Sequence, residues 1–165
     1  MKKLESLLKE KRSVIQEDKI YYIGLGNIFG GDDGFGIEAV TRLKTLGFEN
    51  TFFEYENIDE IVLDLVKNED RKLVFFFDSA DFNKYPGTFS FFEQSEIEDF
   101  GNFHKLPVSL YMKLLNDSGN ESYLIAVQPG NLGHTHSAML SGYIKSALDD
   151  IVKTIYTVFL KEKVR

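Results

Sequence analysis

A run of consecutive apolar residues in the middle of the chain limits the possible folds more than any other feature. Residues 73–77 read LVFFF, without the alternation of polar and apolar side chains that marks a half-exposed strand. Such a run is typical of a strand buried on both faces, as in a parallel sheet. The segment SYLIAVQPG, at 122–130, contains a similar run. A sheet built from such strands needs helices on both of its faces.

Segments with helical periodicity alternate with the expected strands. In the helix expected at 33–46, apolar residues recur on one face, and Gly47 follows as a stop signal. Further helices are expected at 58–67, 105–117 and 136–160, and further strands at 19–25, at 51–56 and after the turn at Pro86-Gly87. The alternation predicts an α/β fold, with helices on both faces of a mostly parallel sheet. The turn at Pro86-Gly87 makes one neighbouring strand antiparallel.

Length and charge restrict the class of protein. The 165 residues suit one domain with a substantial core, and the net charge of −7 argues against binding to nucleic acid or anionic membranes. The chain has no cysteine, which excludes disulfides and thiol nucleophiles. No apolar stretch approaches the ~20 residues that span a bilayer, and we expect a cytoplasmic protein. Residues 1–18 are expected to form a charged helical extension before a domain at 19–165.

The glycine-rich segment GLGNIFGGDDGFG, at 24–36, does not fit a nucleotide-binding loop. Phe29 stands where G-x-G-x-x-G requires its third glycine, and no P-loop motif is present. Asp32 and Asp33 lie at the expected helix start, where two carboxylates would repel a pyrophosphate. We therefore expect the loop to position a carboxylate. Asp32 is interpreted as a helix N-cap and Asp33 as the functional candidate.

Two later residues are candidates to join Asp33. Asp78 ends the most apolar strand, at the edge of the sheet where open α/β folds bind ligands. His104 precedes an expected helix, whose positive end favours a neutral imidazole that can bind a metal. Two carboxylates and one imidazole suit a divalent ion such as Zn²⁺, Ni²⁺ or Co²⁺. His134 and His136 form an H-x-H pair for which we assign no role.

The same segments carry a resemblance to a known family. GLGNIFGGDDGFG resembles the opening motif of the [NiFe]-hydrogenase maturation endopeptidases, and three later segments are similar to later elements of that family in the same order. These segments are VFFFDSADFNKYPGTF, FHKLPVSLYMKLL and IAVQPGNLGHTHS. The resemblance runs from Tyr21 to about Phe159, with Ser79 standing where the family usually has alanine. It implies a single three-layer αβα sandwich around a five-stranded, mostly parallel sheet.

The resemblance also implies a function. By position, the family's metal ligands correspond to Asp33, Asp78 and His104. Gly26 and Asn27 correspond to the family's substrate loop. Such proteins remove a short C-terminal extension from the large-subunit precursor of a [NiFe]-hydrogenase after nickel insertion. The nickel is carried by the substrate and serves as the recognition signal. The expected partner is therefore that precursor, without a nucleotide cofactor, and the protein is expected to be a monomer.

The sequence leaves the chemistry of bond cleavage open. It has no G-x-S-x-G elbow and no H-E-x-x-H motif. Either the nickel polarises the carbonyl or acidifies a water, or Asp33 or Asp78 acts as general base while nickel serves recognition alone. Alternative classes are another α/β metallohydrolase, a nucleotide-dependent enzyme and a nickel-binding accessory protein.

Overall fold

The computed structural model describes residues 1–98, 106–130 and 139–160. In this part of the chain, five strands form one sheet in the order β2-β1-β3-β5-β4. The strands are β1 (Ile20–Gly24), β2 (Thr51–Phe53), β3 (Leu73–Ser79), β4 (Phe89–Phe92) and β5 (Glu121–Val127). Neighbouring strands are parallel except β4, which runs antiparallel to β5. The predicted five-stranded, mostly parallel sheet is confirmed.

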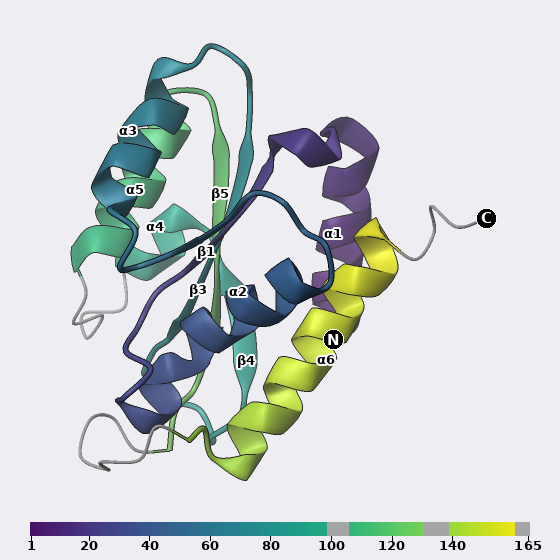
Figure 1. The fold of residues 1–165 in the computed structure, drawn as a ribbon, viewed down its shortest axis with the longest axis vertical. Helices are drawn as coiled ribbons and strands as arrows, with labels where there is room; N and C mark the ends of the chain where they lie inside the picture. The colour runs from purple at the N-terminus through teal and green to yellow at the C-terminus, as the bar shows by residue number, and fades with distance from the viewer. Residues whose placement is uncertain (99–105, 131–138, 161–165) are drawn as a thin grey trace.

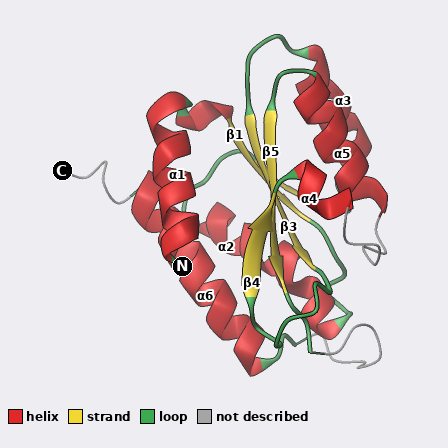
Figure 2. Ribbon diagram, turned by 180° about the vertical axis from the view of Figure 1, so that it is seen from behind, coloured by secondary structure: helices red, strands yellow, loops and turns green. Residues whose placement is uncertain are grey.

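Helices cover both faces of this sheet. The helices are α1 (Lys2–Val14), α2 (Phe35–Thr45), α3 (Ile58–Lys67), α4 (Gln94–Glu98), α5 (Leu106–Asp117) and α6 (Gly142–Phe159). Figure 1 shows α1, α2 and α6 on one side of the strands and α3, α4 and α5 on the other. Seen from behind in Figure 2, the strands run between these two groups of helices. The predicted three-layer αβα sandwich is therefore confirmed.

Strand β3 supplies the centre of both halves of the core. Leu73, Phe75 and Phe77 belong to the cluster that includes α1, α2 and α6. Val74 and Phe76, which alternate with them, belong to the cluster that includes α3 and α5. All five side chains are fully buried. This two-sided burial explains why the strand has no polar residue before Asp78.

The order of the strands reverses between β1 and β3. These strands are neighbours, with Gly24 opposite Phe77 in the register. The chain leaves β1 to form β2 on one side and leaves β3 to form β4 and β5 on the other. Open α/β sheets bind ligands at the carboxyl ends of strands at such a switch point. A ligand site is therefore expected at the residues that follow β1 and end β3.

Inside the domain, the bounds of three predicted elements differ from the observed ones by two residues or more. Helix α2 begins at Phe35 rather than Asp33, because a 3₁₀ turn at Gly31–Gly34 precedes it. Strand β2 ends at Phe53, because the Glu56 N–H donates to the Phe53 carbonyl and turns the chain. Helix α6 begins at Gly142 rather than at residue 136, after residues 131–138, which lie outside the described part.

Helix α1 packs against α6 on the α2 side of the sheet. Leu4 and Leu8 are fully buried in the core there, and the Lys11 Nζ lies 3.0 Å from Glu121 Oε2 at the start of β5. The boundary between a charged extension and the domain stays a prediction. Among the helices of the described residues, none combines the length and hydropathy of a membrane-spanning segment.

Candidate active site

Glycines allow the start of α2 to lie directly on the ends of β1 and β3. An ideal Cβ on Gly36 would lie 2.1 Å from the Phe77 carbonyl oxygen and 2.3 Å from that of Leu25. A Cβ on Gly24 would lie 2.4 Å from the Gly36 carbonyl oxygen. No side chain fits at either position. The close contact holds the turn that contains Asp33 over the carboxyl edge of the sheet.

Gly26 lies against both of the predicted acids. Its φ of +112° is in the region that favours glycine, and an ideal Cβ would lie 1.9 Å from the Asp33 carbonyl oxygen. The same Cβ position is 3.6 Å from Asp78 Oδ1. The structure thus brings Asp33 and Asp78 together around Gly26. Their role as metal ligands stays a prediction.

The Asp33 carboxylate is oriented by donors from two strand ends. The Asn27 N–H donates to Oδ2 at 3.0 Å, and the Ser79 hydroxyl donates to Oδ1 at 3.4 Å. Asn27 also shapes the loop, because its Oδ1 accepts the Phe29 N–H at 2.9 Å. Asp33 is partly exposed, so a ligand can reach it from outside. The two predicted loop residues, Gly26 and Asn27, therefore both contact Asp33.

Asp78 is more deeply placed than Asp33. Its side chain is buried, at 4% exposure, and its Oδ1 accepts the Ser79 N–H at 2.9 Å. Ser79 therefore contacts both acids, with its backbone at Asp78 and its hydroxyl at Asp33. The Ser79 hydroxyl thus gives the Asp33 carboxylate a donor that an alanine at this position would lack.

The predicted third ligand, His104, lies outside the described residues, as do His134 and His136. In residues 1–98, 106–130 and 139–160, no three histidine, aspartate or glutamate side chains are grouped to hold a metal. The described residues therefore supply a pair of acids, and His104 as the third ligand stays a prediction.

Asp32 does not cap a helix, and this prediction is wrong. Its buried carboxylate accepts the Gly130 N–H at 3.1 Å, and the Ser141 N–H and hydroxyl at 2.8 Å each. Gly130 follows β5, and Ser141 immediately precedes α6. Asp32 thus joins the loop after β1 to the segment that begins the last helix. Asp32 therefore connects two loops, whereas Asp33 lies beside Gly26 and Asp78 at the carboxyl edge of the sheet.

Two polar residues at the same edge were missed. Glu54 follows β2, and its Oε2 accepts the Gly26 N–H. Gln128 follows β5, and its Oε1 accepts the N–H groups of Phe82 at 2.9 Å and Lys84 at 3.1 Å, which fixes the loop after β3. Both residues directly follow a parallel strand, so the rule that nominated Asp78 also applies to them.

A pocket of about 220 Å³ adjoins this edge between α3 and α5. Leu25 and Glu54 line it beside the loop, together with Asp59 and Tyr111. The Tyr111 hydroxyl donates to Asp59 Oδ1 at 2.6 Å. Burial, followed by the bond to Asp59, raises the pKa of Tyr111 to about 12, so the phenol keeps its proton at neutral pH. A pocket of about 230 Å³ at the opposite end of β1 contains neither Asp33 nor Asp78.

The fold and the paired acids define an α/β protein with its site at the switch point of the sheet. The family model described as hydrogenase maturation protease matches residues 59–158. That match covers more than half of the chain and includes Asp78. The chain therefore belongs to the hydrogenase maturation protease family, whose members are peptide hydrolases.

Individual relatives agree with this assignment. A Methanocaldococcus jannaschii protein, whose name assigns it to the hydrogenase maturation proteases, is 28% identical over 123 residues. The match covers 69% of this chain and 78% of the relative. The crystal structure of the [NiFe] hydrogenase maturation protease HycI from Thermococcus kodakarensis is 25% identical, with a TM-score of 0.68 over 86% of this chain and 96% of its own. The endopeptidase HycI from Escherichia coli, 16% identical, has the same fold, with a TM-score of 0.69 over 82% of this chain and 87% of its own.

Proposed function

We propose that the protein is the endopeptidase that removes the C-terminal extension of a [NiFe]-hydrogenase large-subunit precursor after nickel insertion. In this proposal, the protein recognises nickel that is already bound to the substrate. The partner is the precursor, and the location is the cytoplasm. The proposal goes beyond the family assignment in naming the substrate, the cut and the signal.

The meeting of Asp33 and Asp78 around Gly26 carries the proposal. The two residues are 45 positions apart in the chain, yet a Cβ on Gly26 would touch the backbone of one and the carboxylate of the other. Oxygen ligands from two carboxylates, with an imidazole nitrogen from His104, suit a borderline divalent cation. Donors from Asn27 and Ser79 hold the carboxylates in place, as the partners of ligating carboxylates commonly do.

In this proposal, the residues of the site orient the nickel that is bound to the substrate and do not hold a metal of their own. Asp33 is the more accessible acid and meets the incoming metal first. Asp78, at the buried end of β3, supplies a fixed second oxygen. The Glu54 bond to the Gly26 N–H and the Asp32 bonds to the start of α6 hold the loop from both sides. A preorganised loop places the scissile peptide relative to the metal without further movement.

The proposal is tested by adding the protein and its variants to the precursor and measuring the product by mass spectrometry. Asp33→Asn, Asp78→Asn and His104→Ala should each lower the processing rate of nickel-loaded precursor by at least about 100-fold, because each removes a ligand. Asp81→Asn is the matched control. Asp81 lies in the loop after β3, and its bond to the Asn83 N–H lowers its pKa. This variant should process the precursor at the wild-type rate.

Nickel-free precursor supplies the second arm of the test. The wild-type protein should leave it uncut, since the cargo is the recognition signal. Full processing by all three ligand variants would end the assignment of the site. Equal cleavage of nickel-free and nickel-loaded precursor would end the assignment of nickel as the signal.

A further inference from the structure

The most exposed large apolar side chains lie at one edge of the sheet. In the described part of the chain, four such side chains have more than two-thirds of their surface exposed. They are Phe29 at 71%, Tyr55 at 71%, Tyr85 at 87% and Met139 at 68%. They follow β1, β2, β3 and β5, one after each parallel strand. We call these four residues the apolar rim.

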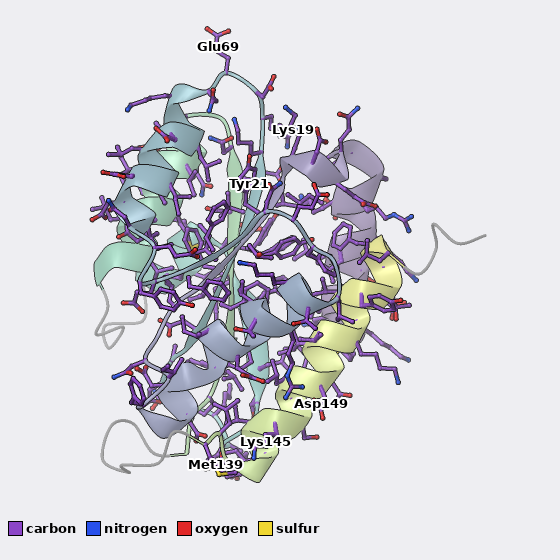
Figure 3. All side chains as sticks on the ribbon, in the orientation of Figure 1. Lys19, Tyr21, Glu69, Met139, Lys145 and Asp149 are labelled. Carbon is purple, nitrogen blue, oxygen red and sulfur yellow. The ribbon has the colours of Figure 1, made fainter. Side chains whose placement is uncertain are left out.

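The rim lies at the edge that carries Asp33 and Asp78, because the carboxyl ends of parallel strands meet at one edge. Figure 3 places Met139 beside the start of α6, at the opposite end of the molecule from Lys19 and Glu69, which precede β1 and β3. The nearby exposed residues Ile28 and Tyr143 extend the apolar surface.

Contacts between the loops hold the rim together. Asp32 binds Gly130 and Ser141 and so joins the Phe29 loop to the segment of Met139. Tyr143 lies against the loop of Tyr85, because a Cβ on Gly87 would be 2.9 Å from the Tyr143 Cβ. Glu54, next to Tyr55, binds the Gly26 N–H. The rim residues are thus presented by one connected set of loops.

The chemistry of the rim fits a protein partner. Phenylalanine, tyrosine and methionine are enriched in protein interfaces, and a group of exposed apolar side chains bordered by polar residues marks an interaction site. The edge also carries Asp33, Asp78 and Glu54, and the whole chain has a net charge of −7. This charge disfavours nucleic acid and anionic lipid as the occupant.

We propose that the apolar rim is the docking surface for the folded body of the large-subunit precursor, separate from the contact with its nickel and its C-terminal tail. The inference rests on the proposed function for the identity of the partner. A substrate that brings a metal centre to Asp33 and Asp78 must cover the side chains that surround them. Docking by the rim sets affinity, while the acids set the rate of the chemical step.

The test compares two double variants, each of which replaces two exposed apolar side chains with serine. Phe29→Ser/Tyr85→Ser removes half of the rim. Leu63→Ser/Leu110→Ser is the matched control on α3 and α5, where these leucines are 47% and 55% exposed. Binding of nickel-loaded precursor to each protein is measured by surface plasmon resonance, and processing is measured for KM and kcat. The rim variant should raise Kd and KM by at least about tenfold, with kcat within about twofold, whereas the control should match the wild type.

Each outcome separates the docking inference from the proposed function. An unchanged Kd and KM in the rim variant, or an equal rise in the control, would overturn the docking inference and leave the proposed function standing. Rim-dependent binding of the precursor by a wild-type protein that cannot cut it would support docking and overturn the proposed function. A free protein that sediments as a dimer, and as a monomer after the rim substitutions, would assign the rim to a second copy of this chain and overturn the inference.

Discussion

Among the single residues, Gly26 is required for the site because a side chain at this position would not fit between Asp33 and Asp78. Its backbone fills the space between Asp33 and Asp78, and its N–H is held by Glu54. A side chain here would have to displace the Asp33 carbonyl. The acid pair therefore depends on a residue that has no functional group of its own.

Gly26→Ala should abolish processing. It should also lower the free energy of unfolding by more than the cost of placing alanine at a positive φ. The new Cβ would lie 1.9 Å from the Asp33 carbonyl oxygen, so the loop must shift. Gly119→Ala is the matched control, because Gly119 has a φ of +86° but open space around it. The control should lose about 1–2 kcal/mol in urea unfolding and keep its activity. Wild-type activity of Gly26→Ala would contradict this account of the loop.

At the scale of the elements, the Asp32 carboxylate connects the β1–α2 loop to the start of α6. Asp32→Asn should lower the free energy of unfolding by about 2–3 kcal/mol, because the amide group replaces an acceptor that faces the Gly130 N–H. Urea unfolding measures the loss. The matched control is Asp149→Asn, which removes an exposed partner of Arg42 between α2 and α6 and should change stability by less than about 1 kcal/mol. Equal stability of the two variants would contradict the role of Asp32.

The ion pair between α1 and β5 should make part of the stability depend on pH. Burial acts to raise the pKa of Glu121, but Lys11 and Arg71 lower it overall from its ordinary value of 4.5. As the pH falls below that value, Glu121 is protonated in the unfolded chain before it is protonated in the folded chain. The stabilisation by the ion pair is therefore lost as the pH falls through the lower pKa of the folded state. It is fully present above the ordinary value.

Glu121→Gln should therefore reduce the loss of stability between about pH 5 and pH 3. The free energy of unfolding, measured across that range by denaturant titration, gives the slope for each protein. Glu60→Gln, on the exposed face of α3, is the control and should follow the wild type. A Glu121→Gln slope equal to that of the wild type would show that the pair does not stabilise the docked helix.

At the scale of the whole molecule, the fold could be predicted because its determinants are local in sequence. The apolar run at 73–77 requires cover on both faces, and the alternation with helices then leaves few topologies. The meeting of Asp33 and Asp78 could also be predicted, since Asp78 lies near the end of β3 and Asp33 lies in the connection that follows the neighbouring strand β1. Gln128 meets the same condition and could have been nominated by the same rule. Glu54 could not, because it was expected inside a strand at 51–56 and follows β2 only since that strand ends at Phe53.

What the sequence could not supply depends on distant partners. The role of Asp32 is set by Gly130 and Ser141, which lie 98 and 109 positions away. A cap and a long-range acceptor look the same in a single sequence, because both are acids at a helix start. The burial of Leu4 and Leu8 under α6 depends in the same way on a helix at the other end of the chain.

We infer that Asp33, Asp78 and His104 bind one cation together. Crystals of the protein soaked in nickel and measured at the nickel absorption edge show whether they do. We predict one anomalous peak within about 2.5 Å of carboxylate oxygens of both acids and of a His104 nitrogen, and its loss in crystals of Asp78→Asn. A peak at His134 and His136 with none between the acids would contradict the claim.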